Sequence, residues 1–163
     1  MQSTEFLYVG LNGYVVGIDR TSGEVVWQWK NPHGIASHGS PTLLPDREAI
    51  FVGITARVFC LSARTGLSIW DWKCPHWYTT ASVVTLLREG DKLFVTVSGH
   101  VYCLNPATGE QSWANELKGF GTPDSPLATS LCSQALPPGA ATPDARDSAI
   151  QALVYQQFRK GPE

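Results

Sequence analysis

The chain has 163 residues, 43% of them apolar, so it can bury the core of one ordinary domain and is not a disordered chain. Charged residues make up 16% and the net charge is −2, which provides no positive field for nucleic acid. No apolar run reaches the roughly 20 residues of a membrane span, and residues 1–10 lack the basic start of a signal peptide. We therefore expect a cytoplasmic protein.

The first part of the chain alternates short apolar runs with turn residues. The runs are Phe6–Gly10, Tyr14–Asp19, Val25–Trp29 and, after a loop that contains Pro32, Gly39–Leu44. Asn12-Gly13 and Ser22-Gly23 separate the first three runs and supply the positive φ that tight hairpins need. The pattern predicts four antiparallel strands.

The same pattern returns twice with a period of 43 residues. This spacing relates Gly23, Gly66 and Gly109 to one another, and likewise Trp27, Trp70 and Trp113. Four strands in a period of about 43 residues are typical of a β-propeller blade. We therefore predict an all-β fold with three four-stranded blades in residues 1–131.

The eleven-residue stretch shared by the three copies has the form small-x-Asp/Asn-x-x-Thr-Gly-x-x-x-Trp. It resembles the tryptophan-docking motif of the quinoprotein alcohol dehydrogenase-like superfamily, with PQQ-like β-propeller repeats, over residues 6–131. The resemblance implies that the three tryptophans pack between neighbouring blades. The chain departs from the family at Ser62, which replaces an acid or amide, and where the family prefers alanine: Gly17, Cys60 and Cys103. WD40 repeats share the period but need further Gly-His and Trp-Asp pairs, so we rank them second.

Three copies are too few for a closed ring, because propellers have about four to eight blades. Residues Ser125–Ser130 resemble the innermost strand that precedes the second copy, which predicts the start of a further blade. An open arc exposes apolar blade faces and unpaired strand edges. Two chains could form a six-bladed ring, the arc could dock on a partner protein, or it could be part of a longer propeller. We favour the last two.

The composition changes after Leu131. Residues 132–142 read as a Pro/Ala-rich linker, and residues 143–161 as a short amphipathic helix with Ile150, Leu153, Val154 and Phe158 at helical spacing. Such a helix would cover an exposed blade edge or act as a docking peptide.

The resemblance also raises the question of a cofactor. Quinoprotein dehydrogenases hold pyrroloquinoline quinone and calcium in an eight-bladed ring, commonly beside a disulfide of adjacent cysteines. This sequence has no adjacent cysteine pair, and we find no Asp/Glu/Asn cluster for such a metal site. We therefore expect no cofactor and no enzymatic activity, because a shared fold does not transfer function.

One polar motif repeats in two of the copies. Lys30-x-Pro32-His33 recurs as Lys73-x-Pro75-His76, and His38 lies close to the first in sequence. Imidazoles at equivalent blade positions could share a metal or an anion, although two histidines make an incomplete site. We expect His100 to be an exposed turn residue.

The four cysteines form no CxxC pair, and we interpret them as free thiols: Cys60, Cys74, Cys103 and Cys132. Cys60 and Cys103 share one blade position and are expected in the core.

Three functions follow from these observations. The leading hypothesis is a non-catalytic protein-interaction scaffold that closes its propeller against a partner or a second copy. The first alternative is a fragment or subunit of a pyrroloquinoline-quinone-dependent oxidoreductase. The second is small-ligand or metal binding at a blade face.

Overall fold

The computed structural model describes residues 6–34, 41–76, 83–121, 126–130 and 133–134, and all regular elements among them are strands. The first sheet contains β1 (Phe6–Leu11), β2 (Tyr14–Asp19) and β3 (Val25–Lys30). The second contains β4 (Thr42–Asp46), β5 (Ala49–Ile54), β6 (Arg57–Ser62) and β7 (Ser68–Lys73). The third contains β8 (Val84–Glu89), β9 (Lys92–Val97), β10 (His100–Leu104) and β11 (Gln111–Asn115), and a ribbon of β12 (Leu127–Ala128) and β13 (Ser133–Gln134) follows.

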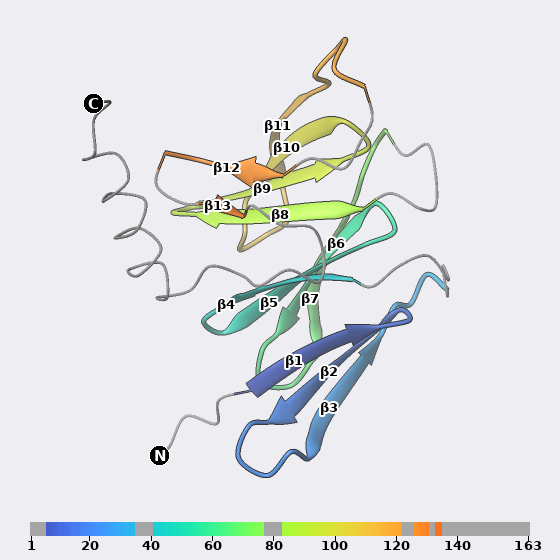
Figure 1. The fold of residues 1–163 in the computed structure, drawn as a ribbon, viewed down its shortest axis with the longest axis vertical. Coiled ribbons are helices and arrows are strands. Elements are labelled where there is room, and N and C mark those ends of the chain that lie inside the picture. Colours follow the sequence, from blue (N-terminus) through green and yellow to red (C-terminus); the bar gives the residue numbers. More distant parts are fainter. Residues whose placement is uncertain (1–5, 35–40, 77–82, 122–125, 131–132, 135–163) are drawn as a thin grey trace, which may run out of the picture.

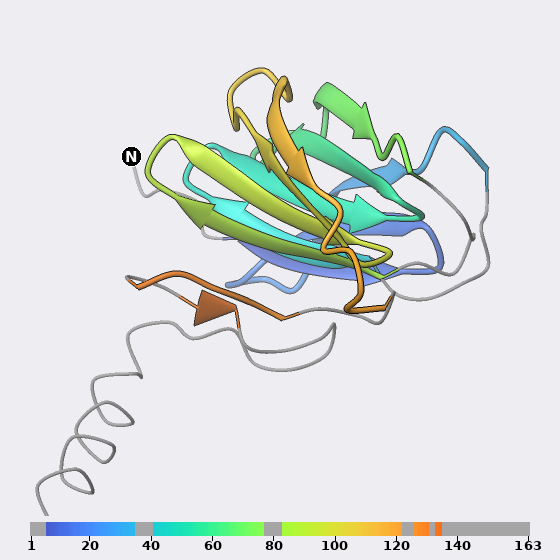
Figure 2. The same ribbon diagram turned by 90° about the horizontal axis from the view of Figure 1, so that it is seen from above.

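Within the second and third sheets the strands lie in chain order and every neighbouring pair is antiparallel. This arrangement confirms the prediction of an all-β fold built from four-stranded propeller blades. The three sheets lie face to face in chain order (Figures 1 and 2). We call them blades 1, 2 and 3. Blade 1 has three strands in the part of the chain that the structure describes, because its first strand, β1, corresponds to the second strand of each other blade.

The end of the repeat region differs in detail from the prediction. Ser125 lies outside the described residues, and within residues 126–130 the strand β12 spans Leu127–Ala128 and pairs with β13. Ser133–Gln134 thus form a strand inside the predicted linker at 132–142. The predicted helix at 143–161 lies outside the described residues. Among the residues that are described, no helix is long and apolar enough to cross a membrane.

The hydrophobic core lies between the blades. Alternate side chains of β5 point to opposite faces of its sheet, so Ile50 and Val52 pack with blade 1 while Phe51 packs with blade 3. Both faces of the central blade are therefore covered, which explains why β5 and β6 are buried along most of their length. A blade at either end of the described array has a neighbouring blade on only one of its faces.

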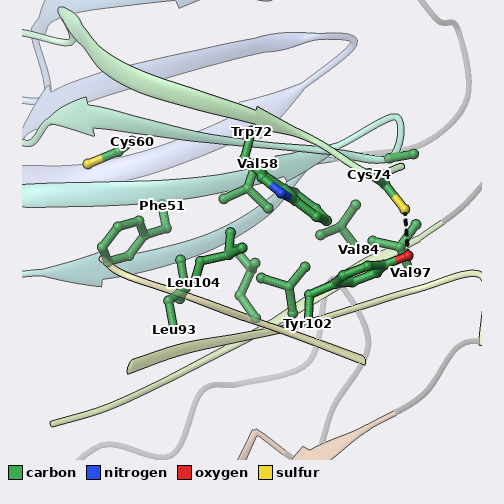
Figure 3. Packing of buried hydrophobic residues seen from close by; sticks show 13 residues of the cluster. Phe51, Val58, Cys60, Trp72, Cys74, Val84, Leu93, Val97, Tyr102 and Leu104 are labelled. Atoms are coloured by element: carbon green, nitrogen blue, oxygen red, sulfur yellow. Dashed lines mark hydrogen bonds between the residues drawn. The ribbon is translucent and has the colours of Figure 1, made fainter. Parts of the chain in front are cut away.

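The core between blades 2 and 3 centres on aromatic side chains (Figure 3). The rings of Trp72 and Tyr102 lie 4.9 Å apart and are tilted by 60°. The thiol of Cys74 donates a hydrogen bond of 3.2 Å to the Tyr102 hydroxyl, which satisfies two buried polar groups. Between blades 1 and 2, Trp29 and Phe59 form the corresponding ring pair at 4.8 Å and 59°.

The hairpin between the second and third strands of a blade requires two residues with positive φ. Blade 1 uses Asn12 and Gly13, with φ of 47° and 79°. Blade 2 uses Thr55 and Ala56, with φ of 51° and 57°, although β-branched residues rarely adopt this conformation. The Thr55 hydroxyl is also buried without a hydrogen-bond partner. This hairpin therefore stores strain.

We expect Thr55→Asn to raise the free energy of unfolding by about 1 kcal/mol, because asparagine tolerates left-handed backbone better than threonine. The measurement is the urea midpoint at unchanged m-value. The reciprocal change in blade 1, Asn12→Thr, should lose a similar amount. If both variants matched the original chain, the hairpin would carry no strain.

Candidate functional site

The candidate site is the surface by which one blade docks on the next, and it starts from a turn that occurs in each copy of the repeat. Gly23, Gly66 and Gly109 have φ of 76°, 70° and 74°. Each glycine N–H donates a hydrogen bond of 2.8 Å to the carbonyl oxygen of the residue four positions earlier. The positive φ turns the chain so that the glycine Cα faces outward without a side chain.

The acid or amide at the start of the turn holds its backbone. The Asp19 carboxylate accepts hydrogen bonds from the N–H groups of Thr21 at 2.7 Å and Ser22 at 2.9 Å. The bonds from Ser22 and Thr21 lower the pKa of Asp19, because they stabilise its charged form. Asn105 accepts one such bond at 2.8 Å, whereas Ser62 accepts a longer one of 3.3 Å. The shorter serine side chain thus preserves the turn with weaker support.

The tryptophan of each of the first two blades docks on the turn of the following blade. The Trp27 Nε1–H donates a hydrogen bond of 3.1 Å to the carbonyl oxygen of Ala63. A Cβ atom on Gly66 would lie 2.4 Å from Trp27 Cε3, so only glycine admits the indole ring there. Tyr8 packs beside the docked tryptophan, with ring centroids 5.9 Å apart.

The same geometry returns one period later. The Trp70 Nε1–H donates a hydrogen bond of 3.0 Å to the carbonyl oxygen of Pro106. A Cβ atom on Gly109 would lie 2.5 Å from Trp70 Cε3. Phe51 takes the place of Tyr8, also at 5.9 Å from its tryptophan. Each joint therefore combines an indole, a glycine turn and a carbonyl acceptor.

The two ends of the array each present half of such a joint. Trp113 of blade 3 contacts Phe94 of its own blade, with ring centroids 6.1 Å apart, yet 44% of its surface is exposed. Trp27, at the equivalent position, is 8% exposed. At the other end, a Cβ atom on Gly23 would meet no atom of the described residues within 4 Å. Among the residues that the structure describes, blade 3 thus carries an indole with no turn against it, and blade 1 carries a glycine turn with no indole against it.

The structure places the candidate metal-binding histidines in separate aromatic contacts. His33 stacks on Phe59 with ring centroids 6.1 Å apart, and its Nε2 lies 3.9 Å from Asp71. His76 stacks on His100 at 4.8 Å and its Nδ1 lies 3.2 Å from the Tyr102 hydroxyl. His38 lies outside the described residues. Within the described ranges, no three His, Cys, Asp or Glu side chains are grouped to hold a metal ion.

The expectation of an exposed His100 is wrong. Its side chain is buried, with 9% exposed, because the ring lies flat against His76 with an interplanar angle of 10°. His100 Nδ1 also lies 3.0 Å from the carbonyl oxygen of Ser98. The loop that carries His76 covers the hairpin of the next blade, which a sequence pattern within one blade does not reveal.

Cys60, Cys74 and Cys103 are buried free thiols, and Cys132 lies outside the described residues. Cys60 faces Trp70 and Cys103 faces Trp113 across their strand pairs. Burial raises the pKa of Cys60 to about 11, and the charge of Asp46 adds to the effect. Burial likewise raises the pKa of Cys103. These thiols are core side chains and poor nucleophiles.

The raised pKa of Cys60 predicts a loss of stability at alkaline pH. The unfolded thiol ionises near its ordinary value of 9.0 and the folded thiol near 11, so stability is complete below pH 9 and falls between these values. We expect Cys60→Ala to lose less stability than the original chain over this window in urea titrations at several pH values. If the stability of Cys60→Ala and of the original chain fell equally with rising pH, Cys60 would not be a buried thiol that stays neutral in the folded state.

Sequence reasoning missed the carbonyl acceptors of Ala63 and Pro106 and the second set of ring pairs. The signal was nevertheless present, since Trp29 and Trp72 are spaced by one period, as are Phe59 and Tyr102. A period identifies equivalent residues, but it does not say which of them meet.

Comparison with protein families gives one match. A family described as outer membrane protein assembly factor BamB matches residues 11–119, more than half of the chain. No curated protein matches the sequence.

Solved structures show the same fold. BamB from Moraxella catarrhalis has a TM-score of 0.55 and 16% identity, covering 69% of this chain and 34% of its own. A europium-containing methanol dehydrogenase has a TM-score of 0.54 and 22% identity, covering 69% of this chain and 23% of its own. The quinohemoprotein alcohol dehydrogenase from Comamonas testosteroni has a TM-score of 0.54 and 17% identity, covering 68% and 19%. The chain therefore spans about a third or less of the length of these structures.

Proposed function

The chain belongs to the family described as outer membrane protein assembly factor BamB, and from this membership we propose that it is a non-catalytic β-propeller scaffold that binds other proteins. Its fold is shared by an assembly factor and by quinone-dependent dehydrogenases, so the fold alone does not choose between scaffold and enzyme. The choice between scaffold and enzyme depends on the contacts and the exposure of the side chains of the repeat.

The exposed indole of Trp113 carries the proposal. The equivalent side chains, Trp27 and Trp70, donate hydrogen bonds to the neighbouring blade, whereas Trp113 is 44% exposed. Phe120, on the segment after β11, is 80% exposed. Exposed aromatic side chains are enriched at protein interfaces, where their burial stabilises the complex. This end of the array is therefore the surface that we assign to a protein partner.

The contacts of the repeat do not favour the oxidoreductase alternative. Trp27 and Trp70, two of the repeat tryptophans that could in principle stack on a quinone, are held between blades. The described residues include no group of three His, Cys, Asp or Glu side chains to hold the calcium ion that accompanies the quinone. The described residues thus offer no support for a site of pyrroloquinoline quinone with calcium, and we favour the scaffold.

Two measurements test the proposal. Titration with pyrroloquinoline quinone and calcium should leave the visible absorption spectrum unchanged and give no dye-coupled oxidation of alcohols or sugars. A new absorption band with turnover would overturn the non-catalytic assignment. In parallel, the immobilised chain should retain proteins that an immobilised Trp113→Ala chain does not. Equal retention by the two chains would remove Trp113 as the binding surface.

The cytoplasmic location remains a prediction. The outer membrane in the family description refers to BamB itself. Fractionation of cells that produce the full natural protein would decide the compartment.

A further inference from the structure

The blades have two rims, one at each end of their strands. The hairpins β1–β2, β5–β6 and β9–β10 all turn at the same rim, on one side of the array in Figure 1. We call it the hairpin rim. β3 and β7 also end there, because Lys30 pairs with Tyr14 and Lys73 pairs with Arg57, each at the start of the neighbouring strand. The glycine turns lie at the opposite rim, since they join the other ends of the same strands.

The two rims differ in charge. Among the described residues of blades 1 and 2, the hairpin rim carries three cations and one acid: Lys30, Arg57 and Lys73, and Asp71. The connections that begin and end at this rim, residues 31–41 and 74–83, contain no Asp, Glu, Lys or Arg, but three histidines: His33, His38 and His76. At the opposite rim of the same blades, four acids outnumber three cations: Asp19, Glu24, Asp46 and Glu48, and Arg20, Arg47 and Arg64.

The acid of the hairpin rim shows which group this surface binds. The Asp71 carboxylate accepts a hydrogen bond of 3.0 Å from Arg57 Nη1, and His33 Nε2 lies 3.9 Å from the same carboxylate. Lys30 is exposed, and its Nζ lies over the ring of Tyr14, 5.5 Å from the ring centroid. One carboxylate does not balance the positive charge of the lysines and the arginine, so the rim has cations to spare for carboxylates from outside.

The repeat itself does not require these charges. In blade 3, His100 stands at the position of Arg57 and Ala114 at the position of Asp71. Blade 3 nevertheless forms the same four strands in the same order. The ion pair of blade 2 also lies at the surface, with 45% of the Asp71 side chain exposed. The charges of the rim therefore do not serve to build a blade, and binding is the role that remains.

We infer that the hairpin rim of blades 1 and 2 binds an acidic segment of a partner protein, whose carboxylates pair with Lys30, Arg57 and Lys73. The inference rests on the proposed scaffold function and adds a second surface with a defined ligand chemistry. A carboxylate suits Arg57, because the guanidinium presents its N–H donors in a fixed fork. Nucleic acid phosphates are also anionic, but the net charge of −2 opposes a long polyanion.

The test is the binding of fluorescein-labelled decapeptides, followed by fluorescence anisotropy at low salt. The acidic probe alternates glutamate with serine, and two further probes carry glutamine or lysine in place of glutamate. We expect the acidic peptide alone to bind, and its affinity should fall as salt is added, because salt screens exposed charges. Equal binding of the glutamine peptide would overturn the inference, since negative charge would then not select the ligand.

Two double variants locate the site. Lys30→Gln with Lys73→Gln should weaken binding of the acidic peptide by about five-fold, since each exposed ion pair contributes modestly. The matched control is Arg47→Gln with Arg64→Gln, which removes the same charge from exposed residues of the opposite rim. The control should bind like the original chain, and circular dichroism verifies that both variants fold. Equal weakening by the two double variants would overturn the assignment to the hairpin rim.

Asp71→Asn should act in the opposite direction. It removes the acid of the rim, so that Arg57 and His33 face the carboxylates of the peptide instead, and we expect binding about three-fold tighter. A gain in affinity cannot arise from a loss of folded protein. Unchanged or weaker binding would overturn the pairing of Arg57 with the ligand.

The proposed function and the inference can fail separately. A chain that binds no acidic peptide but retains a protein through Trp113 would overturn the inference and leave the scaffold function in place. Tighter binding of a labelled single-stranded oligonucleotide than of the acidic peptide would overturn a protein partner at this rim. Quinone-dependent turnover by a chain that binds the acidic peptide would overturn the non-catalytic function alone.

Discussion

Replacing Trp27 by alanine is expected to lower the free energy of unfolding by about 3–5 kcal/mol, the cost typical of deleting a buried aromatic side chain. The indole is 8% exposed, lies against Gly17 and Gly66, and donates a hydrogen bond to the Ala63 carbonyl oxygen. Its loss opens a cavity between blades 1 and 2 and leaves that acceptor without this donor. Urea unfolding followed by circular dichroism measures the change.

Trp113→Ala is the matched control, because it removes the same side chain from the same position of the repeat. Trp113 is 44% exposed and has no following blade on which to dock among the described residues, so we expect a loss of about 1 kcal/mol. Equal losses would mean that docking contributes little to the stability of the array.

The second large effect is expected for Gly66→Ala, which should lower the free energy of unfolding by about 3 kcal/mol. The backbone φ of 70° strains any residue with a Cβ atom, which costs about 1–2 kcal/mol. The added Cβ would also lie 2.4 Å from Trp27 Cε3, so the indole ring must move away from the Gly66 turn. Unfolding in urea and the fluorescence of the displaced indole would report the two consequences.

Gly23→Ala separates the backbone strain at positive φ from the steric clash between the added Cβ atom and an indole ring. Its φ of 76° and its turn hydrogen bonds match those of Gly66, but a Cβ atom there would meet none of the described residues within 4 Å. We therefore expect only the backbone cost of about 1–2 kcal/mol. If Gly66→Ala were no worse than Gly23→Ala, the close approach of Trp27 to the turn would not matter.

The sequence by itself was sufficient for the local structure and for the class of fold. Apolar runs, glycine turns and the 43-residue spacing of Trp27, Trp70 and Trp113 are properties of neighbouring residues or of a strict period, so they predict strands, hairpins and blades without knowledge of the packing. The hydrogen bonds of the Asp19 carboxylate and the Asn105 amide are also a property of neighbouring residues, because they reach only two or three residues along the chain.

Only the tertiary structure decided which residues at the same position of the repeat also make the same contacts. Trp27 and Trp113 occupy the same place in the repeat, yet one is buried and the other exposed, because burial depends on whether a following blade covers the ring. His100 is buried for the same reason, under the loop of the preceding blade that carries His76. A repeated sequence specifies each blade alike, whereas the contacts between blades, and their absence at an end of the described array, depend on position in the stack.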